Sequence, residues 1–284
     1  MPPFEVHPRN TTTALQGRQL EDAEYNWITT ERRKFSSKYK EILKSRRHLP
    51  ASSIDQREAF LEVYHKAAIL LLTGGSAAGK STQVPQHVLC DELEAIRAGK
   101  MVACVQPNRL LARAMAERVA QEMDVLSGSE VGYQKYFHQN ISEHRALNYL
   151  TADVLVQEYK RDPTLSKYVC IIIDELHEET LDKYVLLGLL KLIVTGSATI
   201  PPLRKDLKVI FMSSTLARTK LEEYFGDVAR LDIPEPGIAG RIKYTDKDVL
   251  YDDYLDLCVA LVKHIHLKET KGDILLFLGG EEEI

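Results

Sequence analysis

One short segment punctuated by glycines constrains the fold of this chain more than any other feature. Residues 74–81 read GGSAAGKS, in which two glycines enclose four residues and are followed by lysine and serine. The apolar residues 67–73 (AAILLLT) precede it, and residues 81–97 carry apolar side chains at helical spacing. The sequence therefore predicts a buried strand, a tight loop and a helix in direct succession, as in a parallel α/β sheet.

The spacing within this loop is that of a phosphate-binding loop. Glycines let the backbone fold closely around phosphates, and the N-terminus of the following helix presents positive partial charge to an anion. We expect Lys80 to reach the outer phosphates of a nucleotide and Ser81 to offer its hydroxyl to magnesium. A chance match is the alternative, but the flanking strand and helix argue against it.

The rest of the chain alternates between strand-like and helix-like stretches. Strands are predicted at residues 101–107, 130–137, 146–150, 168–175 and 207–215, and helices at residues 108–123, 152–160 and 181–194. This alternation predicts a mostly parallel sheet covered by helices on both faces. Ligands of such sheets bind at the carboxyl ends of the strands, where the unusual polar clusters of this chain fall.

The clearest of these clusters is IIIDELHEE, residues 171–179. Asp174 ends an apolar strand, where a carboxylate can hold magnesium opposite Ser81. Glu175 follows directly and could deprotonate a water that attacks the terminal phosphate, which favours hydrolysis over transfer to an acceptor as in a kinase. The alternative is that these acids only cap the next helix.

Composition narrows the partners of the chain. The formal net charge of −4 over 284 residues argues against nucleic-acid binding by bulk electrostatics. The one basic concentration, residues 32–48, holds eight Lys or Arg and one acid, so it is a solvated arm or a nuclear-targeting or RNA-contacting segment. Residues 1 to about 30 are polar and are expected to form a flexible extension.

Other broad features are ordinary. No apolar run approaches the roughly 18 residues that span a bilayer, so we expect no membrane association and a location in the nucleus or cytosol. The four cysteines are widely spaced and are expected to be buried free thiols rather than disulfide partners or metal ligands, namely Cys90, Cys104, Cys170 and Cys258.

Seven segments, in this order, resemble the DEAH-box RNA helicases, particularly the branch that serves pre-mRNA splicing and ribosome assembly. The segments are GGSAAGKSTQVPQ, QPNR, VGYQKYF, LTAD, DPTLSKYVCIIIDELHEETLDKYVLLGLLK, FMSSTL and GDILLFLGGEEEI. The resemblance extends from about Arg33 to the last residue. It implies a P-loop NTPase with a RecA-like fold, ATP and Mg²⁺ as cofactors, single-stranded RNA held by its backbone, and a nuclear location. It is also compatible with a monomer that has an activating protein partner.

The resemblance implies a role for each matching residue. Nucleotide binding would fall to Gly74, Gly75, Ser76, Ala77, Ala78, Gly79, Lys80, Ser81 and Thr82, with Arg118 stacking on the base. The catalytic set would be Lys80, Asp174, Glu175, His177, Ser213 and Thr215. Magnesium would be held by Ser81 and Asp174, with Glu175 acting through water, and the RNA backbone by Arg109 and Thr151.

Some residues depart from the family pattern. The family usually has Gly-Ser-Gly before the lysine, whereas this chain has Ala77, Ala78 and Gly79. If position 77 needs a left-handed backbone, alanine costs roughly 1–2 kcal/mol there. Further departures are Asn108, Tyr136, the segment LTADVL, Leu176, Glu179 and Ser214. They bear on RNA grip and on its coupling to ATP more than on nucleotide binding.

The expected domain organisation has three parts. Residues 1–50 are a polar and then basic extension, residues 51–226 a first RecA-like domain, and residues 227–284 the start of a second, with the crossing in EPGIAGRIKYT (235–245). Because the second domain would be incomplete and would lack its catalytic arginines, we expect weak or no hydrolysis by this chain alone. The alternatives are a degenerate nucleotide-binding or regulatory module and an unrelated P-loop kinase.

Overall fold

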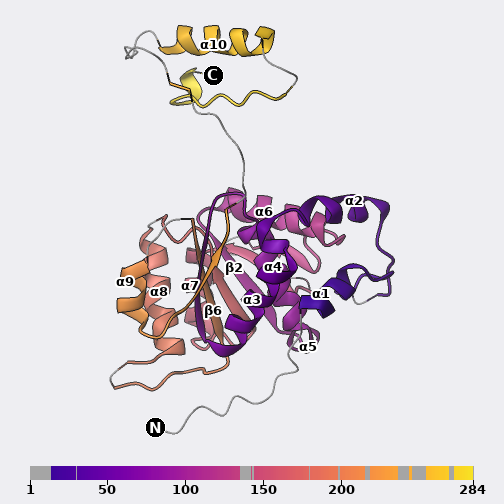
Figure 1. Cartoon of the computed structure of the whole chain (residues 1–284). Helices are drawn as coiled ribbons and strands as arrows, with labels where there is room; N and C mark the ends of the chain where they lie inside the picture. The colour runs from indigo at the N-terminus through magenta and orange to yellow at the C-terminus, as the bar shows by residue number, and fades with distance from the viewer. Residues whose placement is uncertain are drawn as a thin grey trace. The chain divides into compact units, whose positions relative to one another are not determined.

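The computed structural model describes residues 14–29, 31–134, 142, 144–178, 180–197, 199–214, 218–235, 243–244, 254–268 and 272–283. The chain divides into two compact units, Met1–Pro236 and Gly237–Ile284. The first unit is an α/β domain, and Figure 1 labels its helices and two of its strands, β2 and β6. It holds all of the strands in the described part of the chain.

A seven-stranded sheet forms the centre of the first unit, in the order β3-β4-β2-β5-β6-β1-β7. Every pairing between these strands is parallel. The strands are β1 (Ile69–Gly74), β2 (Met101–Gln106), β3 (Val131–Tyr133), β4 (Leu147–Thr151), β5 (Tyr168–Ile173), β6 (Lys208–Ser213) and β7 (Ala229–Ile233). The predicted parallel α/β sheet is therefore confirmed.

Helices cover both faces of this sheet. They are α1 (Ala14–Glu21), α2 (Ser37–Arg46), α3 (Ile54–Lys66), α4 (Lys80–Asp91), α5 (Leu93–Arg97), α6 (Arg109–Glu122), α7 (Ala152–Arg161), α8 (Leu181–Val194) and α9 (Arg218–Phe225), with a short 3-10 helix η1 (Pro50–Ser52). Figure 1 shows α8 and α9 on one side of the strands and α3 and α4 on the other. Helices on both faces bury the central strands β1, β2, β5 and β6, which therefore read as nearly continuous apolar runs.

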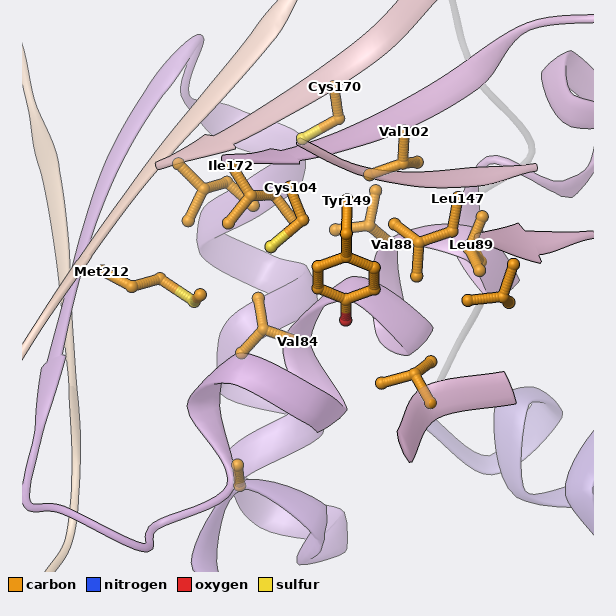
Figure 2. Close-up of a cluster of buried hydrophobic side chains, with 14 of the residues drawn as sticks. Val84, Val88, Leu89, Val102, Cys104, Leu147, Tyr149, Cys170, Ile172 and Met212 are labelled. Atoms are coloured by element: carbon orange, nitrogen blue, oxygen red, sulfur yellow. The ribbon is translucent and has the colours of Figure 1, made fainter. Parts of the chain in front are cut away.

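Alternate residues of each strand build two separate cores, because successive side chains of a strand point to opposite faces. One core joins residues such as Cys104, Tyr149 and Met212 to helices α3, α4 and α6. Figure 2 shows this core, with Val84 and Val88 of α4 packed against the strand residues. The other core joins residues such as Ile171, Ile173 and Phe211 to α7, α8 and α9.

The structure refines the predicted elements at several points. The predicted helix over residues 181–194 has those bounds as α8, whereas the single helix expected over residues 81–97 is divided at Glu92 into α4 and α5. Strand β7 was not predicted. It pairs with β1 at the edge of the sheet and carries Arg230 and Asp232 at alternate positions, so its sequence lacks the apolar run of a buried strand. The first sheet thus extends beyond residue 226, to Ile233.

The N-terminal residues depart from the expectation of a flexible extension. In the described residues from Ala14 onward, helix α1 packs against α3 and α4, and α2 packs against α6. Glu21 is buried and forms ion pairs with two buried arginines, at 3.0 Å to Arg46 and 2.8 Å to Arg57. The prediction was wrong for this segment because Glu21 forms ion pairs with arginines that are distant in sequence, and composition does not reveal such pairs.

Further polar contacts hold the same segment to the C-terminal end of α6. The side-chain amide of Asn26 donates to the carbonyl of Met123 at 2.7 Å. The backbone N–H and the hydroxyl of Ser36 donate to the Asp124 carboxylate at 2.8 and 2.9 Å. Several charges of the basic stretch are also paired, including Arg47 with Asp22 at 2.8 Å. This stretch is therefore partly built into the domain.

The second unit contains helix α10 (Tyr254–Lys268) and a 3-10 turn, η3 (Glu281–Glu283), among its described residues. No residue of α10 is buried. The assignment of residues 227–284 to a second RecA-like domain stays a prediction. None of the described helices is both long and apolar enough to cross a lipid bilayer. All four cysteines are free thiols, and three of them are buried, whereas Cys258 of α10 is only half-buried.

Candidate functional site

The candidate site lies along the edge of the sheet where the parallel strands end. Strand β6 lies between β1 and β5, and the register pairs Thr73 with Ser213 and Ile173 with Phe211. Because neighbouring strands are about 4.8 Å apart, the ends of β1 and β5 are separated by roughly 9–10 Å. The loop after β1 and the acidic segment after β5 therefore face one shared region, with the end of β6 between them.

Two residues of the loop after β1 have a left-handed backbone. Gly79 has a φ of 89° and is the residue from which helix α4 begins. Ala77 also lies in the left-handed region, with a φ of 61°, although it carries a side chain. The sequence-based concern about position 77 is thus justified: a conformation that glycine adopts freely is imposed on alanine.

Several contacts hold the loop in place. The backbone N–H of Ala51 in η1 donates to the carbonyl of Ala78 at 2.9 Å. The hydroxyl of Tyr149 donates to the carbonyl of Ser81 at 3.2 Å. A Cβ atom on Gly74 would lie 2.8 Å from the carbonyl oxygen of Ile233 in β7, so only glycine fits against this strand. The loop is therefore fixed by η1, β4 and β7 together.

Lys80, at the start of α4, turns its side chain back along the loop. Its Nζ donates to the carbonyl oxygens of Gly74 at 2.6 Å and Gly75 at 2.8 Å. Burial lowers the pKa of Lys80, while the carboxylates of Glu175 and Asp174 act in the opposite direction. The ammonium group is thus within electrostatic reach of both acids, as a shared phosphate site requires.

Asp174 follows β5 and is almost completely buried, at 1 % exposure. Its Oδ2 accepts from the side-chain amide of Gln106 at 3.0 Å, and its Oδ1 accepts from the backbone N–H of Glu175 at 2.9 Å. Its own N–H donates to the carbonyl of Val105 at 2.9 Å. These bonds hold the carboxylate in a defined orientation at the end of β5 and help to compensate for its burial.

Glu175 has a φ of 45°, which is unusual for a residue with a side chain. Burial raises its pKa, and the neighbouring charge of Asp174 adds to this effect, while His177 and Lys80 oppose it. Nδ1 of His177 lies 3.3 Å from Oε2 of Glu175, and both side chains are about one-third exposed. Glu175 is therefore a carboxylate with raised proton affinity that still reaches solvent, which suits a general base.

The remaining catalytic candidates belong to β6 and its continuation. Ser213 ends β6 and is buried beside Thr73 of β1 in the register of the sheet. It occupies the position between the phosphate loop and the acidic segment. Thr215 lies outside the described residues, so its predicted role stays a prediction.

Arg118, the predicted base-stacking residue, is linked to the phosphate loop through a buried acid. Its Nε donates to Oε1 of Glu122 at 2.8 Å, and Oε2 of Glu122 accepts from Gln83 of α4 at 2.8 Å. The same Gln83 amide donates to the hydroxyl of Thr82 at 2.8 Å. Arg118 is half-exposed, so its guanidinium is oriented by Glu122 but remains open to a ligand.

The two residues that are predicted to contact RNA, Thr151 and Arg109, both contact Asp153. Thr151 ends β4 and donates its hydroxyl to the carboxylate of Asp153, and the exposed Arg109 lies 3.3 Å from the same carboxylate. Since Gln106 and Thr151 are register partners, this group lies at the same edge of the sheet as the phosphate loop. The resemblance did not identify Asp153, whose carboxylate places a negative charge beside the two predicted RNA-contacting residues.

The residues present suit magnesium and nucleotide phosphate. A serine hydroxyl and a carboxylate are hard oxygen ligands, which Mg²⁺ prefers, and this ion usually completes its coordination with phosphate oxygens and water. No group of three or more His, Cys, Asp or Glu residues that could hold a metal occurs in the described residues. A hydroxyl and one carboxylate leave most of the coordination sphere of Mg²⁺ to phosphate and water, so Ser81 and Asp174 fit a metal that is held jointly with a nucleotide.

Three residues with direct bonds to the candidate site were not predicted from the sequence. Gln106 orients Asp174, Glu122 connects Arg118 to Gln83, and Lys183 of α8 donates to the carbonyls of Glu175 and Glu178. A glutamine at the end of an otherwise apolar strand is a signal that could have identified Gln106. The other two lie on helices, where a charged residue is ordinarily solvated.

The DEAD/DEAH box helicase family model matches residues 53–224, which is more than half of the chain. The matched segment contains β1 to β6, the phosphate loop and the acidic segment. It explains why the fold is a RecA-like parallel sheet with its polar residues at the carboxyl edge. The chain belongs to the DEAD/DEAH box helicase family.

Proposed function

We propose that this chain is an ATP-dependent RNA helicase of the DEAH type, which binds Mg-ATP on the loop of residues 74–82. One observation carries the proposal. The loop after β1, Ser213 at the end of β6 and the Asp174–Glu175 pair after β5 occupy adjacent positions on one edge of the sheet. A site of this kind brings a lysine, a hydroxyl and two carboxylates to one triphosphate.

Each side chain has a defined task in hydrolysis. The Nζ of Lys80 would donate to the outer phosphate oxygens, and Ser81 with Asp174 would hold magnesium, which would neutralise phosphate charge. The carboxylate of Glu175 accepts a proton from water as the water oxygen bonds to the terminal phosphorus and the bond to the leaving phosphate oxygen breaks. The raised pKa of Glu175 supports this role, because a more basic carboxylate is a better proton acceptor.

RNA is proposed to lie across the ends of β2 and β4, on the side of the sheet edge that carries Arg109 and Thr151. Contacts to phosphate and sugar there would tolerate any sequence, as the family resemblance implies. A nuclear role in pre-mRNA splicing or ribosome biogenesis, with an activating protein partner, rests on the DELH segment and its neighbouring motifs. The expected monomer also belongs to this proposal.

The direct test is hydrolysis of radiolabelled ATP by an excess of the full chain, with and without single-stranded RNA. We expect slow Mg-dependent hydrolysis that Lys80→Ala and Glu175→Gln abolish, and stimulation by RNA that Arg109→Ala weakens. Arg113→Ala is the matched control, since Arg113 is an exposed arginine of the same helix that is paired with Glu117. Turnover that persists in Glu175→Gln would contradict the assigned base.

A second candidate function is a nucleotide-binding module that does not remodel RNA. Two observations favour it: Ala77 stands in a left-handed conformation, and the Asp153 carboxylate lies against both residues of the proposed RNA contact. Binding of a fluorescent ATP analogue that is the same with and without RNA, together with no effect of RNA on turnover, would select this candidate.

A further inference from the structure

The acidic segment after β5 is held by a residue from another helix. Lys183 lies in the first turn of α8 and is 3 % exposed. Its Nζ donates to the carbonyl oxygen of Glu175 at 2.8 Å and to that of Glu178 at 2.7 Å. One ammonium group therefore ties together both ends of the turn Glu175–Glu178, which contains the catalytic candidate Glu175.

Both the burial of Lys183 and its position in the first turn of a helix disfavour its charged form. Burial of an ammonium group disfavours its charged form, and burial does lower the pKa of Lys183. The first turn of a helix also disfavours a cation, because the aligned peptide dipoles place positive partial charge there. Both effects act against the residue, so the compensating contacts are specific: two carbonyls and the nearby carboxylates of Glu178, Asp174 and Glu175.

The backbone that Lys183 contacts is strained. Glu175 has a φ of 45°, in a region that residues with side chains seldom occupy. Such a conformation persists where surrounding contacts enforce it. Three other hydrogen bonds from backbone N–H groups contribute here. Leu176 donates to the Met212 carbonyl at 2.9 Å, Glu178 donates to the Glu175 carbonyl at 3.0 Å, and Glu175 donates to Oδ1 of Asp174 at 2.9 Å. Lys183 adds two charge-assisted bonds, which are the stronger kind.

We propose that Lys183 is a positioning residue for Glu175: its ammonium group fixes the strained turn that aims the Glu175 carboxylate at the phosphate site. The inference deepens the proposed function and depends on it for its kinetic consequence. Its structural consequence does not, because the turn is held by Lys183 whether or not nucleotide is hydrolysed.

The test replaces Lys183 by methionine, which keeps the length of the side chain and removes its donors and charge. Lys191→Met is the matched control. Lys191 lies in the last turn of the same helix, and its Nζ lies over the Tyr224 ring instead of contacting the Glu175–Glu178 turn. Single-turnover hydrolysis and the Kd for a fluorescent non-hydrolysable ATP analogue are measured on the full chain. Hydrogen exchange is followed at the amides of Leu176 and Glu178.

We expect the hydrolysis rate of Lys183→Met to fall tenfold to about a hundredfold, because a catalytic group misplaced by about 1 Å costs a factor of this size. The Kd should stay within about threefold, since the phosphate loop is not touched. The two amides should exchange at least about tenfold faster, while strand amides keep their protection. Lys183→Gln retains a neutral amide group that can donate hydrogen bonds and should be intermediate, and it replaces the methionine variant if that one does not fold.

The outcomes separate the two proposals. If Lys183→Met hydrolyses ATP and exchanges the two amides at the rates of the wild-type chain, the positioning role is refuted. Loss of analogue binding together with hydrolysis also refutes it, because the defect would then lie in the phosphate loop. If wild-type turnover is no faster than that of Glu175→Gln, the proposed hydrolysis fails, and the exchange measurement alone still decides whether Lys183 holds the turn.

Discussion

Replacing Ala77 by glycine should stabilise the protein, although it removes a methyl group. Ala77 has a φ of 61° and its side chain is exposed, so the methyl group is held in an unfavourable backbone conformation without contributing to either core. The left-handed conformation costs a residue with a Cβ atom roughly 1–2 kcal/mol. Glycine in the same conformation carries no such penalty.

The expected gain is smaller than this strain, because glycine also makes the unfolded chain more flexible. That effect opposes folding by about 0.4–1 kcal/mol. Subtracting it from the strain leaves a net stabilisation of about 0–1.6 kcal/mol for Ala77→Gly, with a midpoint of about 0.8 kcal/mol. For a cooperative unit of this size, the midpoint corresponds to an increase in Tm of about 2–3 °C.

Ala78→Gly is the matched control, since it makes the same chemical change at the adjacent residue. Ala78 is fully buried in the core shared by α3, α4 and α6 and does not have a positive φ. Loss of a buried methyl group costs about 0.8 kcal/mol, and the added flexibility of the unfolded chain brings the loss to about 1–2 kcal/mol.

Urea denaturation followed by circular dichroism, together with thermal melting, measures both variants against the wild-type chain. Opposite signs are expected: stabilisation at position 77 and destabilisation at position 78. If Ala77→Gly lowers the free energy of unfolding by as much as Ala78→Gly does, then the strain at Ala77 is not present in solution and the reasoning from its backbone angle is refuted.

Three further predictions concern other parts of the molecule. Glu21→Gln should lower the free energy of unfolding by about 3–5 kcal/mol, because it removes the buried counter-charge of Arg46 and Arg57. Urea denaturation tests this, with Asp22→Asn as the control because Asp22 is an exposed neighbour. Equal effects of the two substitutions would contradict the prediction. The rate of ATP hydrolysis should fall on acidification through a pKa above the ordinary 4.5 of glutamate. Burial and Asp174 raise the pKa of Glu175, and only the ionised carboxylate accepts a proton. A pH profile whose acid limb lies at or below 4.5 would argue against this role. A thiol reagent should modify Cys258 rapidly, and should modify Cys90, Cys104 and Cys170 only after unfolding, since these three are buried. Burial also raises the pKa of Cys90 to about 11, which makes its thiol less reactive. A native chain with two or more rapidly reacting thiols would contradict the described burial.

Much of the candidate site could be predicted from the sequence because its signals are local. A strand, the glycine-spaced loop and the start of a helix follow one another within residues 69–91, so their nature depends on neighbours in the chain. Asp174 and Glu175 were found for the same reason, as acids that directly follow the most apolar strand. The question of a left-handed residue at position 77 came from the glycine that the resembling family usually has there, and the φ of 61° shows that Ala77 adopts this conformation.

The N-terminal segment shows where local signals mislead. Its composition is polar, yet Glu21 is buried because Arg46 and Arg57 converge on it from α2 and α3. Lys183 is a similar case, since a lysine in the first turn of a surface helix is ordinarily solvated, but here it is buried against the Glu175 turn. In both cases the partner that makes burial possible is brought close only by folding.

By itself, the sequence determined that this chain forms a parallel α/β sheet with a phosphate-binding loop and an acidic strand end, because hydrophobic period and glycine spacing act through adjacent residues. Only the tertiary structure decided that β6 lies between β1 and β5, so that Ser213 separates the loop from Asp174, and that Lys183 and Gln106 hold the acidic segment. Strand order and the pairing of buried charges depend on how distant segments pack, and a buried polar group is stable only where such packing supplies its partner.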